Sequence, residues 1–169
     1  GWLWSDGVID SRSHMLMPGW FPCIPGWHHD DVPRPPVEVG QHFASMGQPD
    51  YVTPRYRSEH VMCLTGAEHA PTQFALGRVH LPHVPDDDVI YRVWHNVVQE
   101  AVDTRCLRVR EAREGELIHF DDRSLHQGVP AVSSGWRNFI RISRGSDRRP
   151  VNEFRHQTQG YLAAPMAGG

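Results

Sequence analysis

The amino-acid sequence predicts a mainly β domain, a sandwich or barrel of short strands with at least one helix packed on it. The 15 Gly and 14 Pro residues divide the chain into short segments, as is typical of all-β architectures. An apolar content of 39% and six Trp residues indicate a folded core rather than a disordered chain. The length fits a single domain, residues 1–169, with a loose tail expected from about residue 157.

The predicted strands follow from apolar runs and from the alternation of side chains. Residues 105–110 place Arg and Cys on one face and apolar residues on the other, which is the period-two pattern of a strand. Gly77 interrupts one of the apolar runs, and a turn at 128–135 separates the last two strands. The predicted strands span residues 60–64, 72–81, 105–110, 116–120 and 137–143.

A helix is predicted over residues 86–101. Asp86, Asp87 and Asp88 offer an N-terminal cap and a negative first turn, which interacts favourably with the helix dipole. Apolar residues then recur at helical spacing, and this stripe predicts a helix packed on a sheet. The stripe consists of Val89, Ile90, Val93, Trp94, Val97, Val98 and Ala101.

Charge, cysteine content and hydropathy argue against several classes of protein. The net charge of −3 is unlike that of a domain that binds nucleic acid through its overall charge. Cys23, Cys63 and Cys106 are far apart, which argues against zinc ribbons and disulfide frameworks and favours a reducing, cytoplasmic location. No apolar run approaches the roughly 18 residues of a membrane span, so we expect no membrane partner.

A cluster of His and Asp residues lies in segment 18–36, where Pro and Gly favour a loop or a bent edge strand. His28 and Asp30 are separated by one residue, so on extended chain their side chains point to the same side and can bind one metal ion. His29 and Asp31 satisfy the same rule one residue along, and this shift moves both side chains to the opposite face. A polar surface turn is the alternative to a metal site.

His126 and two arginines lie in the second half of the chain. His126 follows a predicted strand and a polar turn, from which it can reach across a sandwich, and a lone structural His is the alternative. Arg137, Phe139 and Arg141 share one face of the last predicted strand. Buried Arg residues are costly unless they meet an anion, and a carboxylate is the natural partner. The alternative is an edge strand whose Arg side chains are solvated.

Together these features resemble the Fe(II)/2-oxoglutarate-dependent dioxygenase superfamily. A His-x-Asp pair is followed by a His 98 residues after His28, and then by Arg residues 11 and 15 positions beyond His126. The resemblance covers roughly residues 20–145. Two His and one carboxylate leave three positions open in the facial triad of non-haem Fe(II) oxygenases.

The resemblance implies a double-stranded β-helix, or jelly roll, that uses Fe(II), 2-oxoglutarate and O2. It implies His28, Asp30 and His126 as metal ligands, and no further catalytic residue. His28 is preferred over His29 because an aromatic residue, here Trp27, often precedes the first His in this superfamily.

The resemblance also implies which residues bind the co-substrate. Arg137 matches the commonest position of the arginine that holds 2-oxoglutarate, and Arg141 matches an alternative position on the same face. Thr72 matches a strand position where many members place a hydroxyl against 2-oxoglutarate. Which arginine holds the co-substrate stays open at this point.

The implied reaction is hydroxylation of a C–H bond, most specifically of the methyl group of a 5-methylpyrimidine in DNA. The chain resembles compact members of the TET/JBP group more loosely than it resembles the superfamily. Alternatives are the same chemistry on a small metabolite, amino acid or protein side chain, a non-redox cupin-like metal-binding protein, and a jelly roll without enzymatic function. The DNA hypothesis depends on possible phosphate contacts and base stacking by Arg144, Arg148, Arg149, Arg155, Trp20, Phe21 and Trp27.

Overall fold

A computed structural model of the chain describes residues 7–34, 49–84, 90–146 and 161–162. Within these residues it contains one helix, α1, over Ile90–Asp103. The strands are β1 Val8–Leu16, β2 Trp20–Phe21, β3 Glu59–Thr65, β4 Thr72–Leu76, β5 Arg108–Glu111, β6 Ile118–Asp121, β7 His126–Gly128, β8 Gly135–Arg144 and β9 Tyr161–Leu162.

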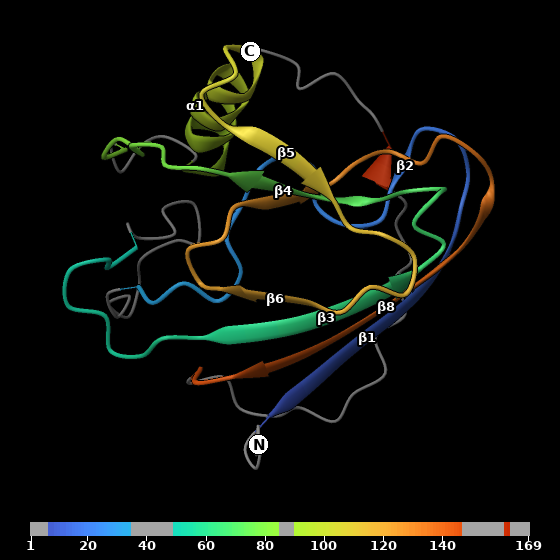
Figure 1. Ribbon diagram of the computed structural model, residues 1–169, viewed down its shortest axis with the longest axis horizontal. Coiled ribbons are helices and arrows are strands. Elements are labelled where there is room, and N and C mark those ends of the chain that lie inside the picture. Colours follow the sequence, from blue (N-terminus) through green and yellow to red (C-terminus); the bar gives the residue numbers. More distant parts are fainter. Residues whose placement is uncertain (1–6, 35–48, 85–89, 147–160, 163–169) are drawn as a thin grey trace, which may run out of the picture.

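The strands form two antiparallel sheets and one short strand pair. A four-stranded sheet has the order β1-β8-β3-β6, a three-stranded sheet has the order β5-β4-β7, and β2 pairs with β9. The two larger sheets lie in separate layers, one above the other in the view of Figure 1. The prediction of a mainly β domain with a helix is therefore confirmed.

One hydrophobic core joins the two sheets. Met62 and Leu64 of β3 and Phe120 of β6 come from the four-stranded sheet, and Phe74 of β4 comes from the three-stranded sheet. Each of these side chains is at most 6% exposed, and burying a side chain of this size stabilises the fold by about 1.5–3 kcal/mol. Because both sheets contribute to this cluster, they pack face to face.

Helix α1 packs on the outer side of the three-stranded sheet. Val98 is fully buried in a second cluster with Trp27 and Leu107, and Ala75 of β4 packs against that cluster. Phe74, the neighbour of Ala75, faces the inner core instead. The predicted apolar stripe is thus confirmed from residue 90 onwards, while the predicted cap lies outside the described residues. No described helix is long and apolar enough to cross a membrane.

Strand β8 carries the arginine face that the sequence predicts. Arg137 and Arg141 are buried and Phe139 is half-buried, whereas Asn138 and Ile140 between them are exposed. The same alternation places both guanidinium groups between the sheets, so these arginines are not the solvated residues of an edge strand. β8 is also a central strand, paired with β1 on one side and β3 on the other.

Strand β1 was not predicted, although it is one of the longest strands of the described chain. Its inward-facing residues include Asp10 and Arg12, opposite Arg141 and Phe139 of β8. Because these inward residues are polar, β1 lacks the alternation of apolar and polar residues that marks a strand. Of the tail expected from about residue 157, the structure describes only Tyr161–Leu162, which pair with β2.

Candidate metal centre

A backbone bridge brings together two His residues that are far apart in the sequence. The N–H of His28 donates to the carbonyl of His126, and the N–H of His126 donates to the carbonyl of His28, both at 3.0 Å. In such an antiparallel pair both side chains lie on the same side. Their ring centroids are 4.6 Å apart. His28 therefore extends the three-stranded sheet at the β7 edge, although its own segment is otherwise irregular.

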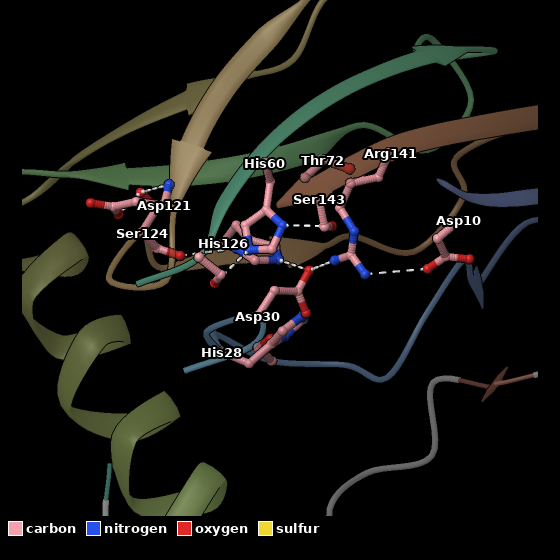
Figure 2. Close-up of polar contacts among 12 residues, drawn as sticks. Asp10, His28, Asp30, His60, Thr72, Asp121, Ser124, His126, Arg141 and Ser143 are labelled. Carbon is pink, nitrogen blue, oxygen red and sulfur yellow. Dashed lines mark hydrogen bonds and ion pairs between the residues drawn. The ribbon is translucent and has the colours of Figure 1, made fainter. Parts of the chain in front are cut away.

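Asp30 completes the metal group, a name we use for His28, Asp30 and His126. One possible ligand atom from each residue lies within 4.8 Å of the other two. Oδ2 of Asp30 is 3.2 Å from Nε2 of His126 (Figure 2). The group is partly buried, since the Asp30 side chain is 25% exposed and that of His126 only 8%.

Backbone carbonyls set the orientation of both imidazoles. Nδ1 of His28 donates to the carbonyl of Gly26 at 2.8 Å, and Nδ1 of His126 donates to the carbonyl of Ser124 at 3.0 Å. With the proton on Nδ1, each Nε2 keeps a lone pair for a metal ion, as in metal-binding His residues generally. A lone pair on His126 that faces the carboxylate of Asp30 is repulsive unless a proton or a metal ion lies between them. The group could therefore hold a metal ion.

Asp121, the last residue of β6, supports this arrangement. Its Oδ1 accepts a hydrogen bond of 2.7 Å from the hydroxyl of Ser124, and Figure 2 shows this contact beside His126. Ser124 is the residue whose carbonyl orients His126. Asp122 points elsewhere: its side chain is 1% exposed and lies 3.3 Å from the guanidinium of Arg57. Of these two neighbouring carboxylates, only Asp121 contacts the support of the metal group.

The electrostatics of the site favour, in His28 and in Asp30, the protonation states that a metal ion needs. Burial, followed by the neighbouring charge of His126, lowers the pKa of His28 to about 4, so its imidazole is neutral at pH 7. Burial alone would raise the pKa of Asp30, but His126 and Arg141 outweigh it and hold that pKa well below its ordinary value. The group therefore presents a neutral imidazole beside an ionised carboxylate.

The alternative pair, His29 and Asp31, does not contribute to this group. His29 is buried on the other side of the segment, where its ring lies 5.5 Å from that of Trp94 of α1. Its Nε2 is 3.3 Å from the hydroxyl of Tyr51. Asp31 has a positive φ of 56°, so the extended chain ends there. The structure thus brings His28 and Asp30, rather than their neighbours, together with His126.

A cavity of about 80 Å3 lies beside the metal group. Arg137 lines it, and its Nε donates to the carbonyl of Ala70 at 2.8 Å while one of its terminal nitrogens donates to the hydroxyl of Thr72 at 2.8 Å. Within the described part of the chain no carboxylate forms an ion pair with Arg137. Burial lowers the pKa of this guanidinium below its ordinary value. Among the described residues, this buried cation has no carboxylate as a counter-charge.

Arg141 has different partners. One of its terminal nitrogens contacts Oδ2 of Asp30, and the other lies 3.3 Å from Oδ2 of Asp10, as Figure 2 shows. Its guanidinium is therefore matched by two carboxylates. Arg141 also lines the cavity.

Sequence reasoning missed the residues of β1 and of the segment after β2 that line or support the site. Asp10 contacts Arg141, while Arg12 and Cys23 line the cavity. No motif marks them, and only the pairing of β1 with β8 could have indicated Asp10. Trp27, which was expected near the site as a base-stacking residue, is 1% exposed and bonds Gln99 of α1, so this expectation is wrong.

Comparisons with protein-family models, with curated proteins and with solved structures give no match to this chain. The resemblance to the dioxygenase superfamily therefore stays a prediction.

Proposed function

We propose that the protein is an Fe(II)- and 2-oxoglutarate-dependent dioxygenase. One observation carries the proposal: the guanidinium of Arg137, which has no carboxylate partner among the described residues, lines the same cavity as the His28, Asp30 and His126 group. A buried cation of this kind is costly without an anion. A dicarboxylate that binds a metal ion at one end and Arg137 at the other satisfies both features.

The metal group fits Fe(II). Two imidazole nitrogens and one carboxylate oxygen form a mixed donor set, which leaves positions open for other ligands and suits non-haem Fe(II). Both imidazoles are already held by carbonyls in the orientation that presents Nε2. His28, Asp30 and His126 would hold the ion, and Asp121 would support His126 through Ser124.

Arg137 and Thr72 would hold the distal carboxylate of 2-oxoglutarate. Arg137 and Arg141 are four residues apart on β8, so their Cα atoms are about 13 Å apart. Their guanidinium groups therefore lie at different ends of the site. Arg141 lies against Asp30, whereas Arg137 lies against Thr72. A guanidinium beside a hydroxyl offers the charge and the donors that a carboxylate needs.

The proposed fold of the site is a double-stranded β-helix. The facing sheets of four and three strands, with the metal group at an edge of the smaller sheet, support this assignment. In such a fold the residues of the chain hold the ligands and exclude water, while the bound groups supply the reaction. With Fe(II), O2 and 2-oxoglutarate bound, the chemistry supplied is oxidative decarboxylation to succinate and CO2 coupled to C–H hydroxylation.

Succinate release tests the proposal. Purified protein is incubated with Fe(II), 2-oxoglutarate, ascorbate and a broad panel of substrates, and the His126→Ala variant serves as the inactive control. Release that requires Fe(II) and is lost in the variant supports a dioxygenase. Iron binding without any succinate indicates a cupin-like metal-binding protein, and the absence of both contradicts the proposal.

The methyl group of a 5-methylpyrimidine stays the most specific substrate prediction. Of its expected aromatic contacts Trp20 is 36% exposed, but Trp27 is buried in the core. Arg144 forms an ion pair with Glu59, and Arg148, Arg149 and Arg155 lie outside the described residues. Mass spectrometry of nucleosides from methylated DNA after incubation tests the prediction, and unchanged 5-methylcytosine and thymine would redirect the search to small metabolites or protein side chains.

A further inference from the structure

The guanidinium of Arg141 spans two carboxylates that come from different parts of the fold. It contacts Asp30 of the irregular segment before β3 and Asp10 of β1, and its remaining nitrogen, Nε, is buried without a hydrogen-bond partner among the described residues. Arg141 is only 4% exposed. This chain of three charged groups ends at the metal group, where Asp30 also meets His126 (Figure 2).

Asp30 lies outside the strands of both sheets, and the contact from Arg141 links its side chain to the four-stranded sheet. The two His residues are joined by their reciprocal bridge, but Asp30 belongs to no strand and comes two residues after that bridge. A metal site requires one orientation of its carboxylate ligand, and a hydrogen bond to that carboxylate helps to fix it. The contact from Arg141 comes from the central strand β8 of the opposite sheet. Arg141 therefore ties the side chain of Asp30 to β8 of the four-stranded sheet.

Asp10 in turn holds Arg141. The two residues are direct partners in the β1–β8 register, and their side chains meet on the inner face of the sheet at 3.3 Å. Asp10 also lies 3.2 Å from Arg12, which is half exposed. A planar guanidinium with two forks can bind two carboxylates at once, whereas an ammonium group offers no such planar arrangement.

We propose that Arg141 is a positioning residue that orients Asp30 toward the metal ion, and that Asp10 holds Arg141 in place. Arg141 contacts Oδ2 of Asp30, the same oxygen that lies 3.2 Å from Nε2 of His126, so it fixes the carboxylate beside the metal group. This assignment rests on the proposed function only through its metal site. Under this assignment Arg137 binds the co-substrate, whereas Arg141 orients a metal ligand.

Titration with Co(II) in the absence of 2-oxoglutarate tests this proposal, because Co(II) takes the same ligands and its visible absorption reports their arrangement. The informative variant is Arg141→Lys, which keeps the positive charge but loses the planar guanidinium. Because the electrostatic repulsion of a metal ion is then unchanged, a loss of affinity reports the lost geometry. We expect this variant to bind Co(II) about 10- to 100-fold more weakly and with a changed spectrum, as for other residues that orient metal ligands. Asp10→Asn should show a smaller loss, about threefold to tenfold, in the same direction.

A double variant and a control separate positioning from general destabilisation. In the Arg141→Lys background, Asp10→Asn should have little further effect, because both residues act through one chain of contacts. Arg144→Lys is the matched control, since Arg144 is also on β8 but pairs with Glu59. It should leave the affinity and the spectrum unchanged. Melting temperatures of the metal-free proteins check folding, and Asp10→Asn keeps the test valid if Arg141→Lys does not fold.

Two results would overturn the positioning role. The first is wild-type affinity and spectrum in both Arg141→Lys and Asp10→Asn. The second is a normal Co(II) site in Arg141→Lys together with weaker binding of 2-oxoglutarate, which would show that Arg141 binds the co-substrate. If the wild-type protein itself binds no Co(II) or Fe(II), the proposed function fails as well, so the two failures are distinguishable.

Discussion

Gly128 lies so close to Cys23 that a Cβ atom at position 128 would be 2.6 Å from Sγ of Cys23. It would also be 2.9 Å from Cγ of Pro22. Gly128 is the partner of Thr72 in the β4–β7 pairing, and both Cys23 and Pro22 line the cavity. The segment that leads to the metal group therefore rests directly on β7, and only a residue without a side chain permits this contact.

We expect Gly128→Ala to destabilise the protein by about 1–3 kcal/mol, because the added methyl group must displace the segment after β2. Urea unfolding measures this loss. Cys23→Ala alone should have a smaller effect, and the double variant should recover part of the stability lost in Gly128→Ala. A double variant no more stable than Gly128→Ala would show that the contact with Cys23 is not the cause.

The choice between His28 and His29 is tested by metal titration of two Ala variants. His28→Ala should abolish binding of Fe(II) or Co(II), because it removes one of three ligands. His29→Ala should retain binding but lower stability by about 2 kcal/mol or more, since it leaves a cavity against Trp94. Loss of metal binding in His29→Ala with little loss of stability would contradict this assignment.

Removal of the Arg137 guanidinium should weaken the binding of 2-oxoglutarate and leave the binding of the metal ion unchanged. A charged hydrogen-bonded partner of a buried carboxylate contributes about 2–3 kcal/mol, so Arg137→Ala should bind 2-oxoglutarate roughly 30- to 150-fold more weakly. Thr72→Val should cost less, about 1 kcal/mol, since it removes one neutral hydroxyl. Calorimetric titration of the metal-loaded protein measures both. Arg144→Ala is the control, and an equal loss in that variant would show that the effect is general.

Acid should destabilise the protein through His60, which is fully buried in the core. The hydroxyl of Ser58 donates to the carbonyl of Asp31, so it accepts from Nε2 of His60, and the hydroxyl of Ser143 donates to Nδ1 of His60. The neutral ring is therefore fully bonded. Burial, followed by the charge of Arg141, lowers the pKa of His60 from 6.5 to about 4.

Because the folded-state pKa is below the unfolded one, the unfolded chain binds the extra proton first. The contribution of His60 to the free energy of unfolding is therefore fully present above pH 6.5 and is lost as the pH falls toward 4. Between pH 8 and pH 5, His60 should lower the free energy of unfolding by about 2 kcal/mol. His28 and His29, whose pKa values are also lowered to about 4, add to the same decline. Urea unfolding of His60→Gln at both pH values should show a smaller decline than the wild type, and an identical decline would contradict this account.

The local pattern of apolar and polar residues was sufficient to predict some helices and strands but not others. Helix α1 and strand β8 were predicted because their own residues alternate or recur with the period of the element. Strand β1 was missed because its inner residues line a polar site and so break the pattern that marks a buried strand. Trp27 was assigned wrongly because an aromatic residue beside a His motif can face either the cavity or the core.

The sequence by itself determined which residues are available to a metal ion: a His-x-Asp pair, a distant His and two arginines on one strand face. Only the tertiary structure decided how they are used. The bridge between His28 and His126 joins positions 98 residues apart, and it turns His28 rather than His29 toward His126. The pairing of β1 with β8 places Asp10 against Arg141, while Arg137 meets Thr72 from the other sheet. Side-chain periodicity is a local property of the chain, whereas the partner of each side chain depends on strands that meet only when the fold closes.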